Sequence, residues 1–208
     1  MVRFAPPSRR REIMDAARGV FQARGYSQAR IAEIAERAGI AAGTLYLYFE
    51  SKEALAQALC EDYVTRLMES IQPHLAHPNT ATAIAESVRT ALAFASAERD
   101  LLPLLGSRVG LGAQSQPLAS ELILHQTLAE TLAARMEQGH IRRYDPRVLA
   151  ELIAGLIEWV SRASALGGNP NAARYQQSLI QMLQHALLTD SSTSVAKAAK
   201  PKKRKKRS

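Results

Sequence analysis

The sequence predicts an all-α protein, in which a small N-terminal three-helix module is followed by a larger helical domain, with about nine helices in total. Three observations predict this class. Apolar residues recur at helical spacing along most of the 208 residues. Glycine and proline fall between the periodic segments, where they end or begin helices. No segment shows the alternation of apolar and polar residues that is typical of a half-buried strand.

The N-terminal module contains three expected helices. The first spans residues 10–24 and ends at Gly25, because glycine adopts the left-handed conformation after a helix at little cost. The second spans about 29–38 and ends at Gly39, and the third is a short helix over about 42–48. Helix, glycine turn and helix in succession form a helix-turn-helix, here packed on the preceding helix.

A long fourth helix is expected after Ser51, which is a favourable N-cap, and we expect it to stop at Pro73. Asp145 followed by Pro146 is a cap with proline at the first helical position. Five further segments have helical periodicity: residues 79–99, 100–106 with an interruption at Pro103, 117–138, 146–166 and 171–188. Asn79 can cap the first of these five helices.

Four parts are expected along the chain. A flexible arm covers residues 1–8, and the helix-turn-helix domain covers 9–68, including the start of the fourth helix. A larger helical domain covers 69–189. The last residues, 190–208, have low complexity and high charge, so we expect them to be disordered.

The net charge of +8 is concentrated at the two ends of the chain. Residues 1–50 carry eight basic and five acidic residues, and residues 190–208 carry eight basic residues and one acidic residue. Residues 51–189 are close to neutral, with eleven basic and thirteen acidic residues. Lysine runs attract phosphate without reading sequence, so we favour a natural DNA-binding arm for the tail. An appended nuclear-import signal and a charged solubility tail stay open.

Composition argues against membrane and secreted classes. No apolar run approaches the roughly 20 residues of a membrane-spanning helix. The amino terminus lacks the apolar segment that a secretory signal requires. Cys60 is the only cysteine and cannot form an internal disulfide, which fits a reducing, cytoplasmic setting.

We expect no enzymatic activity, no cofactor and no metal site. The sequence has no constellation of nucleophile and base and no glycine-rich phosphate loop. His74 and His77 have a spacing that could suit a metal, but no nearby Cys, Asp or Glu offers a third ligand. A solvated turn is therefore the better interpretation of these two histidines.

The stretch AGIAAGTLYLYFESKEAL, residues 38–55, has too few apolar residues to be core throughout. Thr44 can bond a phosphate or pack its methyl group on a thymine, and Lys52 adds a charge beside a helix N-terminus. Tyr46 and Tyr48 offer flat apolar area with hydroxyls that reach phosphates. The alternative is that both tyrosines are half-buried against the three-helix core. We favour the outward-facing interpretation because several features of the stretch agree with it.

Three blocks in register, IMDAARGVFQARGY (13–26), IAEIAERAGI (31–40) and GTLYLYFESKEAL (43–55), closely resemble the TetR family of bacterial transcriptional regulators. The resemblance implies a DNA-binding N-terminal domain, with the arginines at its start as a flexible arm on the DNA. Alanine stands at several positions where the family commonly has hydroxyl or basic side chains, which favours apolar contact and DNA shape over hydrogen-bonded readout. The expected DNA-binding residues are Arg9, Arg10, Arg11, Arg30, Ala42, Gly43, Thr44, Tyr46, Leu47, Tyr48 and Lys52.

The same resemblance implies a C-terminal domain that encloses a small-molecule site between its fourth and seventh helices and forms a homodimer through its last two helices. The candidates for the effector pocket, each of which could also be ordinary core, are Tyr63, Phe94, His125 and Trp159. The candidates for the dimer interface are Leu149, Leu152, Leu156, Val160, Leu179, Met182 and Leu183.

We therefore expect a DNA-binding transcriptional regulator, acting as a repressor that binds a palindromic operator as a dimer and is released by a small, hydrophobic effector. A dimer would place two recognition helices about 34–36 Å apart in successive major grooves. The expected location is the bacterial cytoplasm at the nucleoid, or a nucleus only if the basic tail is an appended import signal. The alternative is a DNA-binding protein with non-specific, tail-driven binding and no effector, which the salt dependence of binding distinguishes.

Overall fold

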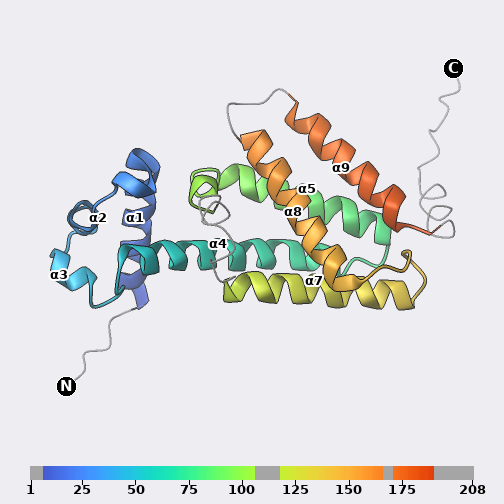
Figure 1. Cartoon of the computed structure of the whole chain (residues 1–208), viewed down its shortest axis with the longest axis horizontal. Helices are drawn as coiled ribbons and strands as arrows, with labels where there is room; N and C mark the ends of the chain where they lie inside the picture. Colours follow the sequence, from blue (N-terminus) through green and yellow to red (C-terminus); the bar gives the residue numbers. More distant parts are fainter. Residues whose placement is uncertain (1–6, 106–117, 166–170, 190–208) are drawn as a thin grey trace, which may run out of the picture. The chain divides into compact units, whose positions relative to one another are not determined.

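The computed structural model of the chain describes residues 7–105, 118–165 and 171–189, and most of these residues are helical (Figure 1). Residues 102–105 form an additional helical turn. Within the described ranges, the one extended pairing is a single antiparallel bridge between Ile141 and Leu188. The all-α prediction is confirmed. The helices in chain order are α1 (Pro7–Gln28), α2 (Ile31–Arg37), α3 (Ala42–Leu45), α4 (Lys52–Leu75), α5 (Thr80–Ala97), α7 (Ala119–Glu137), α8 (Pro146–Ala165) and α9 (Ala172–Leu187).

The chain divides into two compact units. Unit 1 consists of residues 1–66 and 97–122, and unit 2 consists of residues 67–96 and 123–208. The predicted boundary after residue 68 lies close to the first division. Unit 1 also takes in residues 97–122, however, which sequence analysis had assigned to the C-terminal domain.

Three predicted N-caps are made by the residues that the sequence indicated. Ser51 Oγ, Asn79 Oδ1 and Asp145 Oδ1 each accept a backbone N–H from two or three residues further on, at 3.1, 2.9 and 2.9 Å. Such bonds satisfy donors that have no partner inside the first turn of a helix. These caps set the starts of α4, α5 and α8.

The ends of α1 and α4 differ from the prediction. Gly25 has φ 73°, which interrupts α1 as expected, but one further turn continues to Gln28. The predicted stop of the fourth helix at Pro73 is wrong, because α4 continues to Leu75. Arg135 donates to the Leu75 carbonyl oxygen at 2.9 Å, and this bond satisfies an acceptor that the helix end leaves open.

The core of the N-terminal helices joins α1, α2 and α3. Ile13 and Ala17 of α1, Ile34 of α2 and Leu45 of α3 have no exposed surface, and Phe49 has only 3%. Helix α2 contacts both α1 and α3. Because these side chains are enclosed together, α3 is held against a rigid support rather than projecting as an isolated turn.

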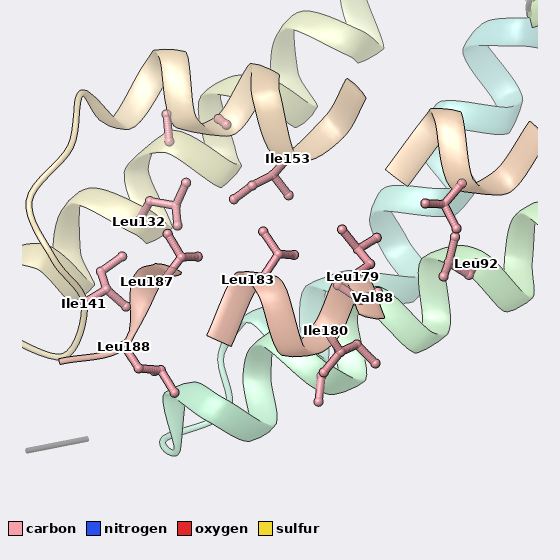
Figure 2. Close-up of a cluster of buried hydrophobic side chains, with 14 of the residues drawn as sticks. Val88, Leu92, Leu132, Ile141, Ile153, Leu179, Ile180, Leu183, Leu187 and Leu188 are labelled. Atoms are coloured by element: carbon pink, nitrogen blue, oxygen red, sulfur yellow. The ribbon is translucent and has the colours of Figure 1, made fainter. Parts of the chain in front are cut away.

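The core of unit 2 gathers apolar side chains from α5, α7, α8 and α9, among them Val88, Leu132 and Ile153 (Figure 2). Leu179 and Leu183 of α9 point into this cluster and are 4% and 5% exposed. Val160 is buried in the same cluster, and Leu149 packs against it.

Candidate nucleic-acid interface

Helix α3 and the turn that follows it have an inner and an outer side. Leu45 and Phe49 point inward and are almost fully buried. Tyr46 and Leu47 lie on the outside, where 53% and 78% of their surface is exposed. The predicted contact residues Ala42 and Gly43 are also exposed, and Thr44 and Tyr48 are half-buried. The interpretation that both tyrosines are core is therefore wrong for Tyr46.

The recognition helix is shorter than predicted. It was expected to reach residue 48, but α3 ends at Leu45, and residues 46–48 form a tight turn. The backbone N–H groups of Tyr48 and Phe49 both donate to the Leu45 carbonyl oxygen, at 2.9 and 3.1 Å. This turn holds the three residues that follow the helix next to the exposed end of α3.

Lys52 is half-buried, and its ammonium group turns back onto the end of α1. Its ammonium nitrogen donates to the carbonyl oxygens of Tyr26, Ser27 and Ala29 at 3.0, 3.4 and 3.2 Å. It also lies 4.6 Å from the centre of the Tyr26 ring, a favourable cation–π distance. The predicted phosphate contact at Lys52 is therefore corrected, since its donors already serve the carbonyl groups at the end of α1.

Tyr26 joins the end of α1 to the start of α4, a role that sequence reasoning missed. Its hydroxyl donates to Glu53 Oε1 at 3.0 Å, and its ring meets that of Phe21 edge-on at 5.5 Å. Burial raises the pKa of Tyr26 to about 12, and the bond to Glu53 adds to the shift. The pKa of Glu53 is lowered by backbone hydrogen bonding and by Tyr26. A tyrosine directly after the glycine that interrupts α1 was the available signal.

The three arginines predicted as a flexible arm lie in α1, which begins at Pro7. Arg9 pairs with Glu12 on the same helix. Arg10 lies 4.6 Å over the Phe49 ring, and Arg11 pairs with an α4 carboxylate. The predicted arm ahead of the helix is therefore wrong for these arginines, and residues 1–6 lie outside the described residues.

Arg30 keeps the position expected of a phosphate contact. It is exposed immediately before α2, and its backbone N–H donates to Glu33 at 3.4 Å. A helix N-terminus with an exposed guanidinium favours anions such as a DNA phosphate. Arg30, Thr44, Tyr46, Leu47 and Tyr48 remain available as contacts.

The four predicted effector-pocket residues differ in burial. Tyr63 is buried, Phe94 and His125 are half-buried, and Trp159 is 56% exposed, with its ring 5.8 Å from that of Tyr175. The exposure of Trp159 contradicts its placement in a closed pocket. A hollow of about 440 Å³ between α5 and α9 is lined by other residues: Ala85, Arg89, Ala173, Gln176, Gln177, Ile180, Gln181 and Gln184.

Exposed apolar residues form a stripe on α8 and α9 in the described part of the chain. Its members, which we call the α8 stripe, are Val148, Leu152, Leu156 and Trp159 of α8 with Met182 of α9. The predicted interface residues Leu152, Leu156 and Met182 belong to it. Val160, Leu179 and Leu183 do not, because they are enclosed in the subunit's own core, and Leu149 is partly buried there. Val148 and Trp159 also belong to the α8 stripe, although they were not among the interface candidates.

The described residues contain no group of three or more His, Cys, Asp or Glu side chains that could hold a metal ion. His77 instead accepts a hydrogen bond from the Asn79 backbone at 3.1 Å, in the turn between α4 and α5. In the part of the chain that the structure covers, no helix is long and apolar enough to cross a membrane.

A supported helix-turn-helix with an exposed second helix, followed by a separate helical unit, defines a DNA-binding transcriptional regulator. Residues 13–59 match the family model described as bacterial regulatory proteins, tetR family. The uncharacterized HTH-type transcriptional regulator YdgC of Bacillus subtilis is 26% identical over 185 residues, covering 86% of this chain and 92% of that protein. The N-terminal helices therefore resemble those of the TetR family of bacterial transcriptional regulators, and the similarity to a transcriptional regulator extends over most of the chain.

Solved structures share the fold over nearly the whole chain. The fatty acid degradation regulator FadR from Bacillus halodurans superimposes with a TM-score of 0.73 at 23% identity, covering 87% of this chain and 96% of that one. The transcriptional regulator FadR from Bacillus subtilis, in complex with stearoyl-CoA, gives a TM-score of 0.69 at 21% identity, covering 83% and 96%. The predicted fold, a helix-turn-helix domain followed by a helical domain, is confirmed.

Proposed function

We propose that the chain is a repressor that binds a palindromic operator as a homodimer and leaves it when a small amphipathic effector binds. The observation that carries the DNA contact is the turn after α3, where Tyr46 and Leu47 are exposed beside buried Leu45. An apolar side chain with 78% of its surface in water contributes little to the fold. The same side chain can pack on thymine methyl groups in a major groove.

The α8 stripe supports the homodimer. Val148, Leu152, Gly155 and Trp159 are spaced by four, three and four residues, the spacing of a helix–helix seam. Gly155 is exposed, and a Cβ atom placed there would meet nothing within 4 Å. Glycine inside a helix costs about 1 kcal/mol relative to alanine, so its place in the middle of an apolar seam favours close approach by a second helix.

Two copies of the chain are also needed to read enough base pairs of DNA. A recognition helix of four residues reads only a few base pairs, too few to specify one site in a genome. Related by a two-fold axis, two copies read two half-sites about one helical turn apart. The operator would accordingly be a palindrome.

An amphipathic effector is proposed from the fold and from structurally similar proteins. The structurally similar FadR of Bacillus subtilis was solved with stearoyl-CoA, an acyl chain with a polar head. We propose the same chemical class for this chain, bound within its C-terminal helices. Non-specific, tail-driven binding is the less favoured alternative, because exposed Tyr46 and Leu47 in the turn after α3 have no role in it.

Selection from a random duplex library tests the proposal. The full-length chain is used at a salt concentration that abolishes its binding to bulk DNA, which removes the contribution of basic residues 190–208. The proposal predicts enrichment of a palindrome with half-site centres about 10 base pairs apart. Its release by a long-chain acyl-CoA, but not by free CoA, tests the effector class. Recovery of no common sequence would leave only the non-specific alternative.

A further inference from the structure

Six charged side chains of unit 1 form one continuous chain of alternating sign. Two come from α1, two from α4, and two from the segment that directly follows α5. Arg18 of α1 donates to both oxygens of Asp100, at 2.5 and 2.6 Å, and forms an ion pair with Glu98 at 2.8 Å. In order along the chain of contacts, the six are Asp100, Arg18, Glu98, Arg66, Asp62 and Arg11.

The middle of this ion-pair chain contains a forked contact between Arg66 and Glu98. Glu98 receives two bonds from the Arg66 guanidinium at 2.9 and 3.1 Å, in addition to its contact with Arg18. Arg66 also donates to Asp62 at 2.7 Å, one helical turn away on α4. A forked guanidinium facing a carboxylate fixes distance and angle together, which a single contact does not.

These carboxylates are largely removed from water. The side chains of Glu98 and Asp100 are only 14% and 10% exposed. The bond to Arg18 lowers the pKa of Asp100, so the carboxyl group stays ionised over the whole neutral range. Ion pairs in such places add little net stability compared with apolar residues, but they specify one arrangement of the elements that they join.

We infer that Glu98 and Asp100 are positioning residues for DNA binding: through Arg18 they hold α1, and with it α2 and α3, in the orientation that meets DNA. Both carboxylates lie outside residues 13–59, the part that matches the family model. Their contacts with α1 also affect the position of α3, because α1 shares the enclosed core with α2 and α3. A shift of residues 98–100 therefore moves the recognition helix.

This inference rests on the DNA-binding function and adds a point of control to it. Residues 98–100 belong to the same compact unit as α1 to α3, although they lie far from these helices in the sequence. A ligand or partner that displaces this short segment would change DNA affinity without touching α3. Coupling of this kind changes affinity by about 5- to 150-fold.

A double-mutant cycle on Arg18 and Asp100 tests the inference, with affinity measured for the duplex that the wild-type chain selects. Asp100→Asn keeps the shape of the side chain and removes its charge, and Arg18→Met removes the guanidinium. Each change alone is expected to weaken DNA binding by about tenfold. The double variant is expected to bind no more weakly than Arg18→Met alone, because Arg18→Met already breaks the bond that Asp100→Asn weakens.

Conservative and matched variants separate positioning from general destabilisation. Asp100→Glu, which keeps the charge, is expected to recover most of the affinity that Asp100→Asn loses. Glu86→Gln removes an exposed carboxylate paired with Arg89 on α5 and is the control, expected to stay within about twofold. Should Asp100→Asn fail to fold, Arg18→Lys keeps the charge without the fork, and a several-fold loss is expected from it.

The outcomes distinguish this inference from the function on which it rests. If the wild-type chain selects no duplex, the proposed function fails. If the wild-type chain binds and folded Asp100→Asn or Arg18→Lys binds equally well, the positioning role is wrong. Additive losses from Arg18→Met and Asp100→Asn would also overturn it, because independent effects do not pass through one bond.

Discussion

Replacement of Lys52 by methionine separates two roles that the sequence alone does not distinguish. If Lys52 contacts a phosphate, its loss weakens DNA binding and leaves the fold intact. If it holds the end of α1, its loss destabilises the fold and removes no phosphate contact. The structure supports the second role, because the ammonium group donates to three backbone carbonyl oxygens within 3.4 Å.

The expected loss of stability follows from these contacts. Hydrogen bonds from charged donors contribute about 1.5–3 kcal/mol when buried, but Lys52 is half-buried, so we take about 0.5 kcal/mol for each of three. The cation–π contact with Tyr26 adds about 0.5 kcal/mol at such a site. Lys52→Met should therefore lower the free energy of unfolding by about 2 kcal/mol.

Two assays decide between the roles. Urea unfolding of the full chain, followed by circular dichroism, measures stability. The dependence of DNA affinity on salt measures phosphate contacts, since removal of one phosphate contact reduces the slope of log K against log salt by about 0.9. Lys52→Met should leave this slope unchanged, whereas Arg30→Met should reduce it and leave stability unchanged. A normal unfolding curve with a reduced slope for Lys52→Met would refute the reasoning.

Three further predictions follow from burial and charge. Leu45→Ala should lower the free energy of unfolding by about 2–5 kcal/mol, because Leu45 is fully enclosed. Leu47→Ala should change the free energy of unfolding by less than about 0.5 kcal/mol and should weaken DNA binding. Equal effects of the two changes on urea unfolding would contradict this prediction. Leu152→Glu should make the protein a monomer, as measured by sedimentation. The control Leu122→Glu changes a similarly exposed leucine on α7 and should leave the dimer intact. A dimer that persists in Leu152→Glu would exclude the α8 stripe as the interface. The pKa of Tyr26 is raised above its usual 10 to about 12, so its contribution to stability is complete below pH 10 and lost as pH rises toward 12. Tyr26→Phe should accordingly lose less stability than the wild type over that interval, and identical pH profiles in thermal unfolding would show that Tyr26 does not titrate there.

Local features of the fold could be predicted from the sequence. Ser51, Asn79 and Asp145 were identified as caps because a cap bonds to a backbone only two or three residues away. Gly25 was placed at a break for the same local reason. The outward side of α3 was also anticipated, because Leu45 and the residues beside it follow a short helical repeat.

Features that depend on distant partners could not be predicted. Lys52 binds carbonyl groups 23 to 26 residues earlier in the chain, and Arg18 binds Asp100 across 82 residues. No local pattern specifies such pairs. The orientation of helix α8 could not be predicted either. Since α8 is apolar on more than one side, its periodicity does not tell which side packs against the core. Val160 turned out to be inside and Trp159 outside, although they are adjacent.

Hydroxyl-radical footprinting of the full-length chain on its selected duplex is the most direct test of paired recognition through α3. The account predicts two protected tracts, separated by about 10 base pairs on one face of the DNA. Both tracts should weaken together in Leu47→Ala. A single tract, or protection that is indifferent to Leu47 and vanishes only when residues 190–208 are removed, would contradict it.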